Sequence, residues 1–560
     1  MDHPMHTPTA PALFTSPAAR GDEWWRGCAV YQIYPRSFAD ANGDGVGDLA
    51  GITARLGHIA ELGADAIWIS PFFRSPMADF GYDVADYCDV DPIFGSLADF
   101  DALVARAHAL GLKVTIDLVF AHTSDQHAWF AASRASRENP HADWYVWADP
   151  KADGTPPNNW QSVFGGPAWT WDARRGQYYY HQFLKEQPQL NCHNPAVQEA
   201  LLAAMRFWLE RGVDGFRLDA LNHSMFDPAL TDNPPAHDDG TARTRSYDFQ
   251  EKRYSMSHPG VVGFVERIAA LCGEYGAIFT VAEVGGGHAE AEMKAYTAGD
   301  HRLSSAYGFN FLYAPQLTPG LVAEALGQWQ GEPGADGLAQ GWPSWAFENH
   351  DAPRAASRWV PAGADAATRA AYCRMKMLLL ACLRGNIFLY QGEELGLTQV
   401  EIPFERLRDP EAIANWPLTL SRDGARTPMP WQAGAAHLGF SPPGASAEPW
   451  LPLGADHAAL AVDRQAADPD SLLRWTQAML ALRKAHRALA TGALAMHAAP
   501  APLIAFERSG AGERLLCVFN LTDAPQAWAP GGAWQVLAST GMVADGHFGP
   551  FSGMVARHHG

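Results

Sequence analysis

The stretch PAVQEALLAAMRFWLERGVDGFRLDA, residues 195–220, contains the structural unit that the rest of the chain repeats. Pro195 can open a helix, and Gly212 can end it. Apolar side chains recur between them at helical spacing, at Val197, Leu201, Met205 and Trp208. Residues 215–218 then form a short apolar run, which is typical of a buried strand. The stretch predicts a helix that leads through a glycine turn into a buried strand.

The same order of helix, glycine and apolar strand returns at four other places. The expected strands are residues 66–69, 113–120, 278–282 and 387–390. Strands that are apolar throughout are covered on both faces, as in a barrel or a doubly wound sheet. The repeat therefore predicts an α/β protein with a parallel sheet.

Three regions lack this unit. Residues 122–191 are rich in Trp, Tyr, Asn and Gly, so we expect an irregular inserted domain B after the strand at 113–120, which is the third when a strand expected before Asp40 is counted first. Residues 491–560 contain short strands and glycine turns, which predict an antiparallel β-sandwich domain. Residues 1–20 are rich in Pro, Ala and Thr and predict a mobile tail. The remaining segments, 21–121 and 192–490, would form the catalytic domain.

Composition narrows the choice of partners. The chain has 560 residues with 41 Lys and Arg against 61 Asp and Glu, a formal net charge of −20, which argues against a nucleic acid or an anionic membrane as ligand. Residues 377–383 form an apolar run too short to span a bilayer, and no cationic segment with an apolar run opens the chain. The seven cysteines are scattered without a CxxC pair, so we expect reduced thiols in a cytoplasmic protein.

Polar residues gather where the expected strands end. His122 follows the strand at 113–120, Arg217 and Asp219 end the strand at 215–218, Glu283 follows 278–282, and Asn349, His350 and Asp351 follow a strand expected at 345–348. If the sheet closes into a (β/α)8 barrel, these strand ends converge on one pocket. The sequence thus predicts three carboxylates, two histidines and an arginine facing one another.

Paired carboxylates favour the cleavage of glycosidic bonds, in which one attacks or stabilises the sugar and the other protonates the leaving oxygen. Arg217 lies two residues before Asp219, so both side chains point to the same side of a strand. We expect this cation to lower the pKa of Asp219 and keep it anionic, as a nucleophile. Glu283 has apolar neighbours that would raise its pKa, which suits an acid.

Several motifs together resemble one family. They are DLVFAHTS (117–124), GFRLDA (215–220), AEV (282–284), FENHD (347–351), GYDVADY (81–87), NNWQSVFGG (158–166), QPQLN (187–191) and RTPMPW (426–431). In this order they are similar to the α-amylase superfamily of glycoside hydrolases, family 13, within its α-glucosidase and oligo-1,6-glucosidase branch. The resemblance implies a TIM barrel, a retaining mechanism and small α-glucosides as substrates.

The resemblance also implies a role for each residue of the pocket. Asp219 would be the nucleophile, Glu283 the general acid/base, and Asp351 a third carboxylate that binds sugar hydroxyls. The expected substrate-binding residues are Asp79, Tyr82, His122, Phe164, Phe183, Arg217, His350 and Arg426. Among them, Asp79 and Arg426 would pair to close the pocket around a terminal glucose, which implies exo cleavage.

The segment DANGDGVGD, residues 40–48, places oxygen ligands at alternate positions around glycines, which suits a hard cation. An EF-hand is excluded because its twelfth position is Gly51 rather than Glu. The resemblance implies one structural Ca²⁺ or Mg²⁺, held by Asp40, Asn42, Asp44, Asp48 and the carbonyl of Val46.

The preferred linkage stays open at this point. Relatives with Val after the nucleophile favour α-1,4 bonds and those with Thr favour α-1,6 bonds, but this chain has Ala220. We expect release of glucose from short substrates such as maltose, or its transfer to acceptor alcohols and sugars. The alternatives are an oligo-1,6-glucosidase and a sucrose- or trehalose-type isomerase. A noncatalytic transporter subunit is disfavoured because all three carboxylates are present, and the sequence allows either a monomer or a homodimer.

Overall fold

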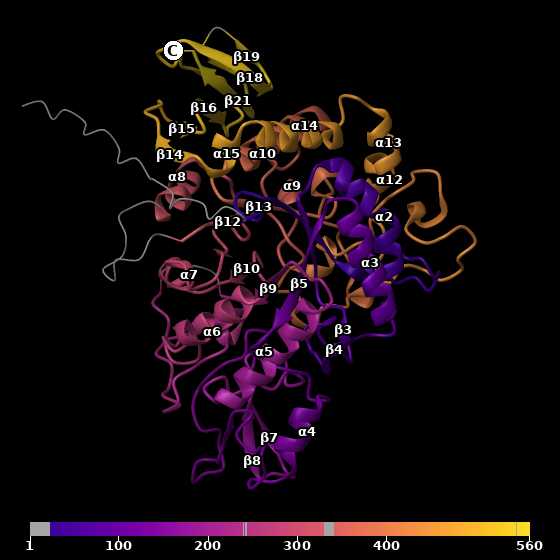
Figure 1. Cartoon of the computed structure of the whole chain (residues 1–560), viewed down its shortest axis with the longest axis vertical. Helices are drawn as coiled ribbons and strands as arrows, with labels where there is room; N and C mark the ends of the chain where they lie inside the picture. The colour runs from indigo at the N-terminus through magenta and orange to yellow at the C-terminus, as the bar shows by residue number, and fades with distance from the viewer. Residues whose placement is uncertain (1–22, 239, 241–242, 330–340, 545, 560) are drawn as a thin grey trace, which may run out of the picture.

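The structure is a computed structural model, and it describes residues 23–238, 240, 243–329, 341–544 and 546–559. The tail predicted at residues 1–20 lies outside the described residues. A parallel sheet of eight strands forms the centre of the molecule (Figure 1). The strands are β1 (Ala29–Ile33), β2 (Ala66–Ile69), β5 (Lys113–Val119), β9 (Gly215–Asp219), β10 (Phe279–Glu283), β11 (Ser305–Tyr307), β12 (Ser344–Ala346) and β13 (Asn386–Tyr390).

The sheet closes on itself. Its strand order is β11-β10-β9-β5-β2-β1-β13-β12, and a parallel bridge between Ala306 and Pro343 joins the two outer strands. Helices lie between successive strands and cover the outside: α2 (Leu49–Leu62), α3 (Leu97–Ala109), α5 (Pro195–Leu209), α6 (Val261–Gly273), α7 (Ala289–Thr297), α8 (Pro319–Gln328) and α10 (Ala366–Cys382). The predicted (β/α)8 barrel is confirmed.

Helix α5 shows how the sequence specifies one unit of the barrel. The Asn194 side chain caps the helix by accepting the N–H of Ala196, and Pro195 occupies the first turn. The apolar positions predicted from the sequence are all buried. Gly212 then adopts a φ of 88°, a left-handed conformation that glycine reaches at little cost, and the chain turns into β9.

Besides the short antiparallel pair β3 (Phe73–Arg74) and β4 (Asp86–Val90), two larger antiparallel regions flank the barrel. Between β5 and α5 lie α4 (Ala128–Ala135) and an antiparallel sheet of β6 (Trp147–Ala148), β8 (Gln177–Tyr180) and β7 (Trp169–Asp172). The last part of the chain forms two antiparallel sheets, β14-β15-β16-β21-β18 and β17-β20-β19. Their strands are β14 (Ala493–Met496), β15 (Leu503–Gly510), β16 (Glu513–Asn520), β17 (Gln526–Ala527), β18 (Trp534–Thr540), β19 (Val543–Ala544), β20 (His547–Phe548) and β21 (Ser552–His558). The inserted and C-terminal sheets lie at opposite ends of the molecule (Figure 1).

The antiparallel sheets at the end of the chain confirm the predicted C-terminal β-domain. Its predicted hairpin is β15 and β16, which pair from Leu503 opposite Asn520 to Gly510 opposite Glu513. Among the helices that the structure describes, none is long and apolar enough to cross a membrane. The exact division of the chain at residues 121/122, 191/192 and 490/491 stays a prediction.

Candidate active site

Arg217 lies at the centre of the candidate site. It belongs to β9, where the strand register sets it beside Asp117 of β5, and its side chain is fully buried. Its Nη1 lies 2.9 Å from Asp117 Oδ1 and 2.6 Å from Asp219 Oδ1, and its Nη2 lies 2.6 Å from Glu283 Oε2. One guanidinium therefore binds carboxylates from the ends of three neighbouring strands, β5, β9 and β10.

Glu283 is held in a fixed orientation by two further groups. The Tyr307 hydroxyl donates to Oε1 at 3.2 Å, and the Ala220 N–H donates to Oε2 at 3.3 Å. Ala220 adopts a φ of 40°, a strained left-handed conformation, directly after Asp219. Burial raises the pKa of Glu283 to about 7, although Arg217 opposes that rise. The predicted raised pKa of this carboxyl group is confirmed.

The pKa expected for Asp219 was wrong in direction. Burial raises it to about 7, and the charge of Asp117 adds to the rise, while Arg217 lowers it. The spacing of the two residues along one strand pairs Arg217 with Asp219 alone. In the structure the same cation is shared with Asp117 and Glu283, so it offsets only part of the cost of burying the charge.

Asp351 lies in a different electrostatic environment. It follows β12, and the Asn349 side chain fixes the turn by accepting the Asp351 N–H at 2.9 Å. Arg426 Nη2 lies 2.7 Å and Arg422 Nη1 3.3 Å from Asp351 Oδ1. Burial opposes ionisation, but the guanidiniums of Arg426 and Arg422 hold the pKa of Asp351 well below its usual range. This carboxylate is therefore ionised at neutral pH.

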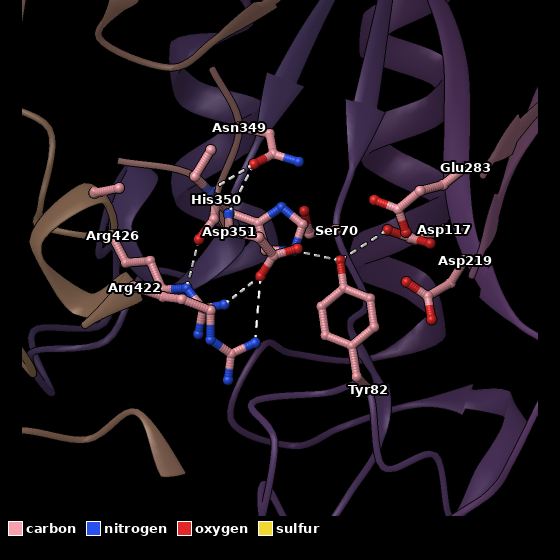
Figure 2. A network of polar contacts seen from close by, with 12 residues as sticks. Ser70, Tyr82, Asp117, Asp219, Glu283, Asn349, His350, Asp351, Arg422 and Arg426 are labelled. Carbon is pink, nitrogen blue, oxygen red and sulfur yellow. Dashed lines mark hydrogen bonds and ion pairs between the residues drawn. The ribbon is translucent and has the colours of Figure 1, made fainter. Parts of the chain in front are cut away.

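Tyr82 and His350 connect the two groups of charges, as Figure 2 shows. Their rings stack at 5.3 Å with an interplanar angle of 4°. The Gln32 amide nitrogen lies 2.8 Å from His350 Nδ1, which assigns the ring proton to Nε2, 2.6 Å from the Tyr82 hydroxyl. That hydroxyl donates to Asp117 Oδ2 at 3.0 Å. Burial lowers the pKa of His350 to about 3, so the imidazole acts as a neutral hydrogen-bonding group.

The structure corrects the expected pairing of Asp79 with Arg426. Asp79 Oδ1 lies 3.0 Å from Arg422 Nη2, and Arg422 also binds Asp409 at 2.8 Å. Arg426 instead binds Asp351 and donates from Nε to the His350 carbonyl at 2.8 Å. Arg422 thus pairs with Asp79 in place of Arg426. The turn between the two arginines brings both guanidiniums to the carboxylate of Asp351.

His122 and the two phenylalanines of the insertion reach the same place. His122 Nε2 lies 3.1 Å from the Tyr82 carbonyl, and burial lowers its pKa to about 3. The Phe183 ring lies 5.1 Å from the His122 ring and 5.7 Å from that of Phe164. The Arg422 guanidinium lies 5.0 Å from the Phe164 ring centre. All the pocket residues predicted from the sequence therefore form one connected group.

Several residues of this group were not predicted. They are Asp117, Tyr307, Arg422, Gln32 and Gln187. Asp117 is the first residue of the motif DLVFAHTS, and Arg422 lies four residues before the motif RTPMPW. The position of these motifs could therefore have pointed to both residues. Tyr307 ends a strand of only three residues, which is too short to show a hydrophobic pattern in the sequence.

The predicted metal loop fits a cation in its chemistry. Asp40 and Asp48 are buried, and burial raises the pKa of Asp48. No basic side chain in the described part of the chain forms an ion pair with either of them. Their carboxylates accept backbone N–H groups, from Gly43 and Gly45 to Asp40 and from Gly51 to Asp48. Within the described ranges no three acidic, His or Cys side chains gather as a metal-binding group.

Comparison with known proteins gives one consistent result. Residues 32–492 match the family described as alpha amylase, catalytic domain. A probable alpha-glucosidase of Rhizobium meliloti is 52% identical over 507 residues, 90% of each chain, and an oligo-1,6-glucosidase of Heyndrickxia coagulans is 36% identical over 92% of this chain and 95% of its own.

Two solved structures of related enzymes are similar to this chain over nearly its whole length. The alpha-glucosyl transfer enzyme XgtA superposes with a TM-score of 0.89 at 47% identity, covering 96% of this chain and all of its own. The trehalulose synthase MutB of Pseudomonas mesoacidophila gives a TM-score of 0.85 at 30% identity, covering 97% of this chain and all of its own.

Proposed function

The chain belongs to the α-amylase family of glycoside hydrolases, and we propose that it is a retaining, exo-acting α-glucosidase. It would release terminal α-D-glucose from short α-glucosides such as maltose, or transfer that glucose to an alcohol or sugar. The observation that carries this proposal is the guanidinium of Arg217, which holds Asp219 and Glu283 side by side at 2.6 Å each.

Each carboxylate has a part in the proposed reaction. Asp219 attacks the anomeric carbon and forms a β-glucosyl ester, while Glu283 gives its proton to the leaving oxygen. Burial raises the pKa of both carboxyl groups, which favours keeping the one proton that this step requires. Glu283 then takes a proton from water or an acceptor alcohol, whose oxygen displaces Asp219.

The charged end of the pocket supports exo action. Asp351 is held anionic by Arg422 and Arg426, and Asp79 binds the same Arg422. Anionic oxygens beside fixed guanidiniums suit the hydroxyl groups of one terminal sugar. We infer that Asp79, Asp351 and the two arginines close the pocket behind that sugar.

The relatives suggest two alternatives on the same site. One is hydrolysis of α-1,6 bonds, as the name of the Heyndrickxia enzyme states, and the other is isomerisation, as in the trehalulose synthase. Chromatography of the products from maltose, isomaltose, trehalose and sucrose separates them. Our proposal predicts mainly glucose and transfer products from maltose. A rearranged disaccharide as the main product would favour the isomerase.

We also propose a structural Ca²⁺ or Mg²⁺ at the loop of residues 40–48. The support is its oxygen-rich sequence and two buried carboxylates, Asp40 and Asp48, which a cation would neutralise. A cytoplasmic location is proposed from the cysteines, all seven of which are free thiols. A monomer and a homodimer both remain compatible with this proposal, and gel filtration with light scattering decides between them.

A further inference from the structure

Asn222 is a buried side chain that the proposed reaction does not use. It lies in the short turn η1 (Leu221–His223), three residues after Asp219, and none of its surface reaches solvent. Its Nδ2 lies 2.8 Å from the carbonyl oxygen of Gly285 and 2.7 Å from Glu292 Oε2. A carbonyl and a carboxylate both accept hydrogen bonds, so the amide nitrogen must face them and donate to each.

The backbone pairing of β9 and β10 stops before the two carboxylates of the proposed reaction. Its last pair is Leu218 opposite Ala282. Asp219 and Glu283 each come one residue later, so the strand ladder does not by itself set the separation of their carboxyl groups. In a retaining reaction this separation decides whether one group can attack while the other protonates. Arg217 binds both groups, and contacts beyond the strand ends limit how far each can move.

Two hydrogen bonds join the strand ends beyond the last backbone pair. The Ala220 N–H, next to the nucleophile, donates to Glu283 Oε2 at 3.3 Å. The Asn222 amide donates to Gly285, which follows Glu283 by two residues. These two bonds and the chain between them form a closed ring that contains Ala220 and Glu283. Removing the Asn222 amide opens the ring and frees the end of β10 to move relative to Asp219.

The turn that carries Asn222 is itself held in place. The Ala220 carbonyl accepts the His223 N–H at 2.9 Å, and the His223 carbonyl accepts Gln189 Nε2 at 2.8 Å. The Asn222 carbonyl accepts the Ser257 N–H at 2.7 Å. Because these bonds fix the backbone of the turn, the Asn222 side chain holds the end of β10 from a rigid base.

We propose that Asn222 is a positioning residue, which sets the place of Glu283 relative to Asp219 and so favours substrates whose leaving group needs an acid. The inference rests on the proposed function, because it concerns the protonation of the leaving oxygen. Glu283 gives its proton to the glycosidic oxygen, the bond from that oxygen to the anomeric carbon breaks, and Asp219 forms the new bond. A misplacement of about 1 Å can slow such a step by about 100-fold.

The test compares two substrates of the full-length enzyme. Maltose has a sugar leaving group that needs the acid, whereas α-D-glucosyl fluoride needs the nucleophile and little acid help. We measure kcat/KM for both, since it covers only the steps up to departure of the leaving group. Asn222→Asp keeps the shape of the side chain but removes its N–H donors, and Asn222→Ala removes them without adding a charge. Both should lower kcat/KM by about 30-fold to 100-fold on maltose and by less than about threefold on the fluoride.

Asn520→Asp is the matched control. The Asn520 amide is also buried, and it donates to the carbonyls of Ala524 and Gly549 at 2.8 Å each, within the C-terminal domain. Its ratio of the two kcat/KM values should stay within about twofold of wild type, because the site is distant. Glu292→Ala is a second variant, which removes one partner of Asn222 from the half-buried face of α7. It should lower the maltose-to-fluoride ratio by about twofold to fivefold, the size of one hydrogen bond.

A merely structural role of Asn222 lowers both rates by the same factor. The proposal is overturned if the folded Asn222 variants lose activity equally on the two substrates, if they keep the wild-type rate on maltose, or if Asn520→Asp changes the ratio as much. Should the Asn222 variants fail to fold, as judged by circular dichroism, an unchanged ratio in Glu292→Ala overturns it. Turnover of neither substrate by wild type would instead contradict the proposed function.

Discussion

Replacing Tyr307 by Phe tests how the structure tunes the proposed acid. The hydroxyl donates to Glu283 Oε1 at 3.2 Å and accepts from Arg217 Nε at 3.1 Å. A hydrogen bond donated to a carboxylate favours its ionised form, so removing the bond should raise the pKa of Glu283 further. A bond worth about 1 kcal/mol corresponds to about 0.7 pKa unit.

The direction in which the pH profile moves follows from the role of Glu283 as an acid. Glu283 must be protonated to act, so activity falls as pH rises through its pKa. In Tyr307→Phe the basic limb of kcat/KM on maltose should therefore move to higher pH, by about 0.7 unit. Tyr145→Phe is the control, since its buried hydroxyl contacts Thr123 at 2.6 Å and, among the residues that the structure describes, bonds to no carboxylate. A limb that stays in place, or moves down, would refute the reasoning.

Three other changes give separate expectations. Asp219→Asn should lower kcat by about 10³-fold or more, and near-wild-type turnover of maltose would remove it as the nucleophile. Arg422→Met removes the cation that pairs with Asp79 and Asp409, and it should lower kcat/KM by about 100-fold or more. A change below about twofold would contradict a role of Arg422 in the pocket. Chelation should lower Tm, by about 1 °C for each kcal/mol of lost binding energy in a chain of this length, with little effect on the rate at 25 °C. Equal loss of stability and rate would move the cation into the active site.

The sequence predicted most of the barrel because most of its strands are apolar runs that follow a helix and a glycine. The strand predicted at residues 215–218 is β9 with Asp219 added, and the one predicted at 387–390 is β13 with Asn386 added. Strand β11 was not predicted, since it has only three residues and begins with Ser305. The strand expected at 345–348 lies at Ser344–Ala346, because Phe347 and Glu348 already belong to the loop that carries Asp351.

The site was predictable where it depends on strand ends, and less so where it depends on loops or on burial. His122, Asp219 and Glu283 converge because the barrel requires it. Asp79 pairs with Arg422 because of the path of the loop that carries this arginine. A hydrophobic pattern in the sequence does not predict the path of a loop. The pKa of Asp219 is decided by full burial and by the sharing of Arg217, which are properties of the packed molecule.

The proposed reaction requires that Asp219 becomes covalently glucosylated. The most direct measurement traps that ester in Glu283→Gln, which cannot activate water, with α-D-glucosyl fluoride, whose leaving group needs little acid help. Mass spectrometry of the intact protein and of its peptides should find one added glucosyl residue, on the peptide that contains Asp219. An adduct on another residue, or fluoride release with no adduct on rapid quenching, would contradict the account.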